Sequence, residues 1–133
     1  MPSHKTLLDI EIDPVPKPRM VKSDSWKKRP AVERYWAFKD ELLLKIGKGF
    51  EMPDSNYHLI FWIPMPKSWS EKKKEEMLGR PHQQRPDKDN LEKAFLDCVC
   101  KEDCTIWDGR VSKYWGITGK IFLKKLEEKI NQL

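Results

Sequence analysis

Residues 56 to 64, with the sequence NYHLIFWIP, constrain the fold more than any other stretch of the chain. The run is short, rich in β-branched and aromatic residues, and closed by a proline. Such a run is typical of a strand that is covered on both faces, which predicts a sheet built around it. Its histidine, His58, has no paired ligand nearby in the sequence, so we interpret it as a structural residue.

Two patterns place a strand and a helix ahead of this run. Between residues 7 and 13, Leu8, Ile10 and Ile12 alternate with acidic neighbours, which is the period of a half-buried strand. From Ala31 to about Ile46, apolar residues recur at close to helical period, and glycines at 47 and 49 supply the stop.

The elements after the run are further helices and strands. Residues 68 to 79 begin with Ser68 as a candidate cap, have Glu71 three positions later and end in glycine, which predicts a short solvated helix. The last third predicts one or two strands through Leu123 and then a short amphipathic tail. Strands mixed with helices over 133 residues predict one domain, 1–133, of the α/β (α+β) class, with a small mixed β-sheet packed with helices.

The chain shows no targeting or membrane signal. Its longest apolar run, LIFWIP, is far shorter than the roughly 20 residues of a membrane span. The first residues lack the basic start, apolar middle and cleavage site of a secretory signal, so we expect a cytoplasmic protein.

Three cysteines lie close together, at Cys98, Cys100 and Cys104. Their odd number favours reduced thiols over a disulfide framework. A small zinc-dependent interaction protein is the alternative, but the spacing C-x-C-x3-C with no nearby fourth ligand does not match a structural zinc site.

The positive charge of the chain is concentrated in one segment. The net charge is +5, and residues 17 to 34 contain seven basic and two acidic side chains among several prolines, which predicts an extended basic loop. Such a surface favours a polyanion like nucleic acid, because each lysine or arginine that meets a phosphate releases counterions. An ordinary solvated loop would carry the same charge.

Carboxylates gather in RPDKDNLEKAFLDC, residues 85 to 98. The apolar residues follow an i, i+3, i+4, i+7 pattern, which predicts an amphipathic helix starting at Asp89 or Asn90. If the backbone stays extended through Asp89, then Asp87 and Asp89 project to the same face. Further along, Asp89, Lys93 and Asp97 are spaced by four on one exposed ridge.

A fourth acid, Asp108, stands before a glycine in a predicted turn and is placed to close the cluster. Each acid alone has a local explanation as a cap, an ion-pair partner or a turn residue. Two carboxylates about 4 Å apart, however, repel by about 4 kcal/mol at an effective dielectric near 20, against about 1 kcal/mol for a cap. Oxygen ligands without paired His or Cys indicate Mg²⁺ or Mn²⁺, and with a basic protein they indicate phosphodiester hydrolysis.

The stretch HQQRPDKDNLEKAFLDCV, from residue 82, followed by WDGRV, resembles the RusA family of Holliday junction resolvases. The family signature is roughly H-x-x-[KR]-P-D-x-D-N-L-x-K-x-x-x-D, followed eleven residues later by another Asp and x-x-Val. The match runs from residue 82 to residue 111 without a gap. The stretch PVPKPRM is similar, more weakly, to the amino-terminal P-x-x-K-x-R region of the family.

The resemblance implies an endodeoxyribonuclease with a RusA-like fold that depends on Mg²⁺, with Mn²⁺ as a possible substitute. It implies a phage or bacterial homodimer that resolves four-way DNA junctions in recombination and repair. Neither a nucleotide cofactor nor a membrane partner is expected. The catalytic residues would be Asp87, Asp89, Asp108 and Lys93, and the three acids would ligate the metal. Asn90 and Asp97 match the signature too.

Basic residues of the loop and of the signature are the expected DNA contacts: Lys17, Arg19, Lys22, Lys27, Lys28, Arg29 and Arg85. One departure concerns Trp107, which stands where many family members carry an acid beside the distal Asp, so metal affinity or junction selectivity can differ. The alternative to an enzyme is a non-catalytic nucleic-acid-binding module that uses the basic loop 17–34.

Overall fold

A four-stranded sheet with β2 (Tyr57–Pro64) inside it forms the framework of this computed structural model, which describes residues 4–19, 29–102 and 105–126. The strand order is β1-β4-β2-β3, with β1 (His4–Glu11), β3 (Gly109–Gly116) and β4 (Lys120–Leu126). β2 pairs parallel with β3 and antiparallel with β4, which pairs antiparallel with β1. The predicted mixed sheet in an α+β fold is confirmed.

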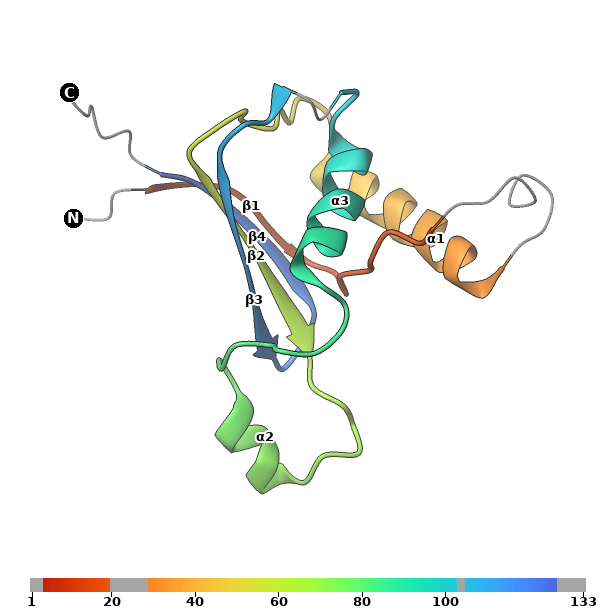
Figure 1. Ribbon diagram of the computed structural model, residues 1–133, viewed down its shortest axis with the longest axis vertical. Helices are drawn as coiled ribbons and strands as arrows, with labels where there is room; N and C mark the ends of the chain where they lie inside the picture. Colours follow the sequence, from red (N-terminus) through yellow and green to blue (C-terminus); the bar gives the residue numbers. More distant parts are fainter. Residues whose placement is uncertain (1–3, 20–28, 103–104, 127–133) are drawn as a thin grey trace.

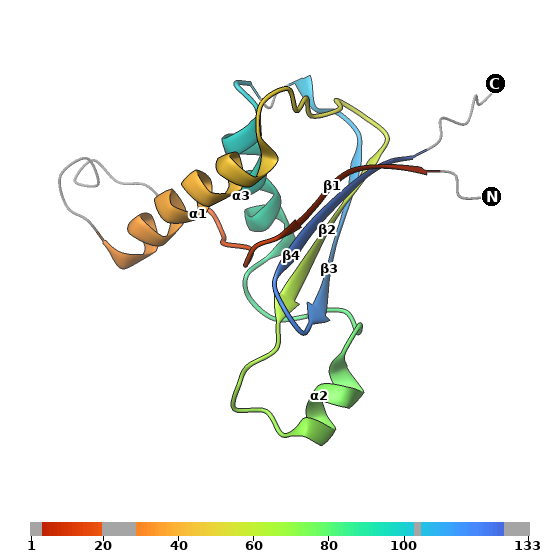
Figure 2. The ribbon, with the colours of Figure 1, turned by 180° about the vertical axis from the view of Figure 1, so that it is seen from behind.

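Two helices lie on the same face of the sheet, as Figures 1 and 2 show. They are α1 (Pro30–Ile46), which has its proline in the first turn, and α3 (Lys88–Val99). A shorter helix, α2 (Glu71–Met77), lies beyond the end of the sheet, in the connection that leads from β2 to α3 (Figure 1).

The core forms between this face and the two helices. The sheet contributes alternate residues, because side chains at i and i+2 of a strand share a face. The helices contribute stripes at helical spacing. The buried set includes Leu8, Ile10, Leu59, Phe61, Ile121 and Leu123 from the strands and Tyr35, Phe38, Leu42, Leu91, Ala94 and Phe95 from the helices.

The other face of the sheet carries neither α1 nor α3 (Figure 2). The strand expected at residues 56 to 64 is therefore confirmed, but the expected cover on both faces is wrong for the described chain. His58 lies on this second face and its Nε2 is 2.9 Å from the hydroxyl of Ser112, so its structural interpretation agrees with a local partner.

Element boundaries differ from those expected in three places. β1 begins and ends earlier than residues 7 to 13. α2 is capped by Ser70, whose hydroxyl accepts a hydrogen bond from the backbone N–H of Lys73 at 3.1 Å, so the expected cap at Ser68 is wrong. The last strand extends to Leu126, and the tail expected after it lies outside the described residues.

The connection that contains α2 returns along the outer edge of β3. The N–H of Gly79 donates to the carbonyl of Trp115 at 2.9 Å, and the N–H of His82 donates to the carbonyl of Lys113 at 3.0 Å. The ring of Trp69 packs on that of Trp115, with centroids 4.8 Å apart. None of the described helices is long and apolar enough to cross a membrane.

We predict that Gly109→Ala lowers the free energy of unfolding by about 1–3 kcal/mol, because over-packing forces a shift of the neighbours. A Cβ at Gly109 would lie 2.1 Å from Cζ of Tyr57, whose ring covers the start of β3. Urea denaturation of both proteins measures the change. Arg110→Ala, at the exposed next position, is the control and is expected to stay within about 0.5 kcal/mol of the parent. Equal, small effects at both positions would contradict the prediction.

Candidate active site

Asp87 is the N-cap of α3, with extended backbone at φ −68° and ψ 148°. Its carbonyl accepts the N–H of Leu91 at 3.1 Å, while its carboxylate makes no capping hydrogen bond. The expected start of the helix at Asp89 or Asn90 is wrong, because α3 already includes Lys88. Asp89 thus lies in the first helical turn and not on extended backbone, so an alternating strand-like geometry does not orient the two acids.

A pocket opens beside Asp87. It is lined by Pro16, Lys17, Arg85, Pro86, Asp87 and Asn90. The backbone N–H of Lys17 donates to the carbonyl of Asn90 at 3.3 Å, which ties the segment after β1 to the start of α3. Two of the basic residues expected to bind DNA therefore share a pocket with one of the expected metal ligands.

Asp97 of α3 pairs with two lysines, one from the same helix and one from the segment after β1. Its carboxylate is 3.0 Å from Nζ of Lys93, one helical turn before it, and 3.2 Å from Nζ of Lys17. Lys17 also lies over the ring of Tyr35, 4.4 Å from the centroid. This network connects the predicted catalytic lysine to the pocket that contains Asp87.

Asp108 holds the start of β2. The backbone N–H of Asn56 donates to its carbonyl oxygen at 2.9 Å and approaches its carboxylate oxygen Oδ2 at 3.3 Å. The neighbouring Trp107 is 74% exposed. The backbone N–H of Trp107 donates to the carbonyl of Asp54 at 3.0 Å. Asp108 is therefore positioned by backbone contacts at the amino-terminal ends of β2 and β3.

The sequence alone did not indicate Glu92 and Tyr57. The hydroxyl of Tyr57 donates to the carboxylate of Glu92 at 3.1 Å, which joins the start of β2 to the middle of α3. Burial raises the pKa of Tyr57, and the charges of Glu92 and Asp108 add to the shift, so the hydroxyl stays protonated and remains a donor. The signature leaves position 92 open, and no local pattern pairs it with a tyrosine 35 residues away.

The three expected metal ligands do not form a ready-made cluster. Among the described residues, which include Asp87, Asp89 and Asp108, no group of three or more His, Cys, Asp or Glu side chains is placed to hold an ion. Asp87 and Asp89 are both exposed at the start of α3. This pair of oxygen donors suits Mg²⁺, which is commonly bound through one or two carboxylates together with water and substrate phosphate. Ligation by Asp108 stays a prediction.

The remaining expected DNA contacts are only partly described. Arg19 and Arg29 are exposed, and Nη2 of Arg29 donates to the carbonyl of Arg19 at 2.7 Å, so the two lie together at the ends of the basic loop. Lys22, Lys27 and Lys28 lie outside the described residues.

The cysteines do not support zinc within the part of the chain that the structure describes. Cys98 and Cys100 form no disulfide with each other, and Cys104 lies outside the described residues. Burial raises the pKa of Cys98, which disfavours the thiolate that zinc requires, and its sulfur lies 3.7 Å from the hydroxyl of Tyr35. Its position in α3 makes it a packing residue beside the core.

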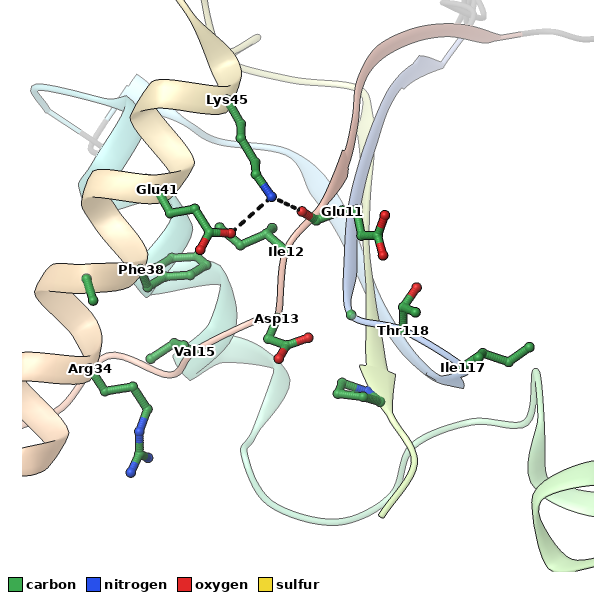
Figure 3. A pocket seen from close by; sticks show the side chains of 13 residues that line it. Glu11, Ile12, Asp13, Val15, Arg34, Phe38, Glu41, Lys45, Ile117 and Thr118 are labelled. Atoms are coloured by element: carbon green, nitrogen blue, oxygen red, sulfur yellow. Dashed lines mark hydrogen bonds and ion pairs between the residues drawn. The ribbon is translucent and has the colours of Figure 1, made fainter. Parts of the chain in front are cut away.

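Another groove, shown in Figure 3, lies between α1, the end of β1 and the turn before β4. Its lining contains the carboxylates of Glu11, Asp13 and Glu41 with only Arg34 and Lys45 as basic partners. It includes none of the predicted catalytic residues, and its acidic lining is unsuited to a phosphate backbone. The pocket beside Asp87 is therefore the better candidate.

The segment that carries Asp87 is held against β3 by His82 and Lys113. His82 is buried and its ring packs at a tilt against that of Trp115, with centroids 4.3 Å apart. Its Nδ1 has no hydrogen-bond partner among the described residues. The amine of Lys113 donates to the carbonyls of Gln84 and Pro86. The matched signature includes His82 but not Lys113, which lies beyond its last matched position.

Comparison with protein families matches residues 11–124 to Endodeoxyribonuclease RusA. The chain belongs to the RusA family. This RusA protein is thus an endodeoxyribonuclease, a hydrolase that acts on DNA. The match contains Asp87, Asp89, Asp108, Lys93 and the pocket between β1 and α3. No curated protein and no solved structure matches the chain.

We predict that the stability of this RusA protein falls as the pH drops below about 6.5, the ordinary pKa of histidine. Burial lowers the pKa of His58 and His82, with Arg110 and Lys113, respectively, adding to the shift. The unfolded chain then binds more protons than the folded protein, so acid favours unfolding. Urea unfolding between about pH 7.5 and about pH 5.5 measures this slope, and a His58→Gln/His82→Gln double variant is expected to flatten it. A parent slope that is flat or of opposite sign would contradict the assignment.

Proposed function

We propose that this RusA protein is a Mg²⁺-dependent endonuclease that resolves four-way DNA junctions by paired phosphodiester hydrolysis. The observation that carries the proposal is the pocket in which Lys17 and Arg85 flank Asp87 at the start of α3. It combines side chains that attract a phosphate with a carboxylate that attracts the metal, which is the combination that phosphodiester hydrolysis requires.

The chain's own residues bind and orient the scissile phosphate. Arg85 and Lys17 would contact its oxygens, and the amino-terminal end of the α3 dipole favours negative charge at the same place. Asp87 and Asp89 would hold the ion, with Asp108 as the third ligand implied by the signature. When bound, the ion polarises the phosphate and lowers the pKa of a bound water.

Lys93 would balance the charge that builds on the phosphate during attack. Its ion pair with Asp97 at 3.0 Å keeps the amine on the same ridge as Asp89, one helical turn away. Asp97 also pairs with Lys17, so the network couples the lysine for catalysis to the lysine for phosphate binding. Exposed Trp107, beside Asp108, is suited to stack on an unpaired base of a branched substrate.

A non-catalytic DNA-binding module is the alternative, with the basic loop 17–34 as its contact surface. Membership of an endodeoxyribonuclease family favours the enzyme. The enzyme also accounts for Asp87 and Lys93 together with the basic residues, whereas a binding module assigns no role to the exposed carboxylates at the phosphate pocket.

We predict that the purified protein cuts a synthetic four-way junction symmetrically in the presence of Mg²⁺ and leaves the matching linear duplex intact. Asp89→Asn keeps the shape of the side chain but removes a negative ligand, so cleavage is expected to fall by at least about 100-fold while junction binding persists. Denaturing gels measure cleavage, and fluorescence anisotropy without metal measures binding. A parent protein that binds the junction and does not cut it would support the alternative. Cleavage at the parental rate by Asp89→Asn, or cleavage without metal, would contradict the assigned metal site.

We also propose a homodimer, because a two-fold assembly presents two equivalent sites to the two strands that a junction resolvase cuts. The sheet face without α1 and α3 offers a surface for the second copy. Its centre consists of half-buried Ile60, Trp62, Tyr114 and Phe122, with the rings of Trp62 and Tyr114 5.2 Å apart. Strands about 4.8 Å apart with a rise of about 3.3 Å per residue give about 500 Å² per copy, near the lower limit of a specific interface.

We predict that Phe122→Glu converts the dimer into a monomer, because it places a charge at the centre of this face without touching the helix side. Size-exclusion chromatography with light scattering measures the mass. Leu44→Glu is the control, since Leu44 is 83% exposed on α1, and it is expected to stay dimeric. A parent protein that is monomeric, or a Phe122→Glu protein that remains dimeric, would rule out this surface.

A further inference from the structure

One lysine of β3 is bonded to the segment that carries the acids. Nζ of Lys113 donates to the carbonyl of Gln84 at 2.5 Å and to the carbonyl of Pro86 at 2.6 Å. These two carbonyls stand on either side of Arg85, and the second belongs to the residue directly before Asp87. A single amine therefore fixes the backbone on both sides of Arg85 and immediately ahead of Asp87.

The backbone of the same residue makes a third contact. The carbonyl of Lys113 accepts the N–H of His82 at 3.0 Å, so the side chain and the main chain of one residue hold both ends of the segment from 82 to 86. Buried His82, whose ring packs against that of Trp115, anchors the first end. The segment therefore follows β3 in a fixed path up to the start of α3.

The amine of Lys113 gives up part of its hydration for these contacts. Burial lowers its pKa, and the nearby carboxylate of Asp87 partly opposes that shift. Hydrogen bonds from a charged donor to carbonyls are stronger than neutral ones, and two of them define both distance and direction. The side chain faces α3 with Val111 and Trp115, because residues two apart in a strand share a face.

We propose that Lys113 is a positioning residue that sets the distance between Arg85 and Asp87 and thereby the metal and phosphate binding of the pocket. The inference rests on the proposed function and extends it to a residue outside the signature. Lys113 does not contact the substrate in this role. It acts through the backbone of residues 84 to 86, and this backbone positions the side chains of Arg85 and Asp87.

The test compares Lys113→Met with Lys45→Met and with the parent protein. Methionine retains the length of the side chain and removes the donor. Lys45 is the matched control, because its amine also donates to a backbone carbonyl, that of Glu11, and pairs with Glu41 at 3.1 Å in the groove of Figure 3. Binding of Mn²⁺ without DNA, followed by electron paramagnetic resonance of the free ion, gives a readout independent of cleavage.

For Lys113→Met we expect Mn²⁺ affinity to fall by about tenfold and the Mg²⁺ concentration for half-maximal cleavage to rise by a similar factor, a typical effect of losing a residue that orients a metal ligand. The cleavage rate at saturating Mg²⁺ is expected to change by less than about threefold, because the substitution weakens metal binding and leaves the reacting groups unchanged. Lys113→Arg retains a donor for both carbonyls and is expected to recover most of the Mn²⁺ affinity. Lys45→Met is expected to match the parent in every measurement.

The outcomes separate this inference from the proposed function. If the parent binds Mn²⁺ and cuts junctions, and Lys113→Met does both with the same metal dependence as Lys45→Met, Lys113 has no positioning role and the proposed function stands. If the parent neither binds Mn²⁺ nor cuts, both proposals fail. Should Lys113→Met not fold, Lys113→Gln, which keeps one donor group, takes its place with the same expected direction.

Discussion

The packing of α3 on the sheet is the interaction on which the candidate site depends. Leu91, Ala94 and Phe95 are almost fully buried against the strands and α1. Burial of a leucine or phenylalanine side chain contributes about 1.5–3 kcal/mol, so this stripe fixes the rotation of the helix about its axis. Once that rotation is fixed, Asp89 and Lys93 must lie on the outer side, toward solvent.

The same packing explains why the two ends of the site differ. At the start of α3, exposed Asp87 lies beside a pocket with two basic side chains. Near the starts of β2 and β3, the carboxylate of Glu92 accepts a hydrogen bond from the hydroxyl of Tyr57, and that of Asp108 accepts one from the backbone N–H of Asn56. The first arrangement leaves oxygen atoms accessible to an ion and a phosphate, whereas the second uses its carboxylates in contacts within the protein.

The sequence predicted the parts of the fold that depend on local patterns. The helical spacing of α1 and α3 and the strand at 57–64 follow from periodicity and composition, and the mixture of helices and strands indicated the α+β class. The start of α3 was misplaced by one or two residues, because Asp87, Asp89 and Asn90 are all good N-caps and only tertiary contacts choose among them. The prediction that both faces of β2 are covered was wrong, because an apolar strand sequence does not reveal whether a helix of the same chain or another partner covers its second face.

The contacts that organise the site could not be predicted in this way. The signature named Asp87, Asp89, Lys93 and Asp108, but it contains no information on how far apart they lie in space. Lys113 and Pro86 are separated by 27 residues, and Tyr57 and Glu92 by 35, so neither pair leaves a periodic signal. Such long-range pairs depend on the strand order, which places β3 next to β2 and beneath α3.

The return of the chain along β3 has a consequence for solubility. A strand at the end of a sheet exposes unpaired N–H and carbonyl groups that can recruit a strand of another molecule. Here the residues from Gly79 to His82 occupy those groups on Trp115 and Lys113, and the rings of Trp69 and His82 lie against Trp115. The edge beside the candidate site is thereby shielded from unwanted strand addition, and the chain that shields it is the one that delivers Asp87 to its place.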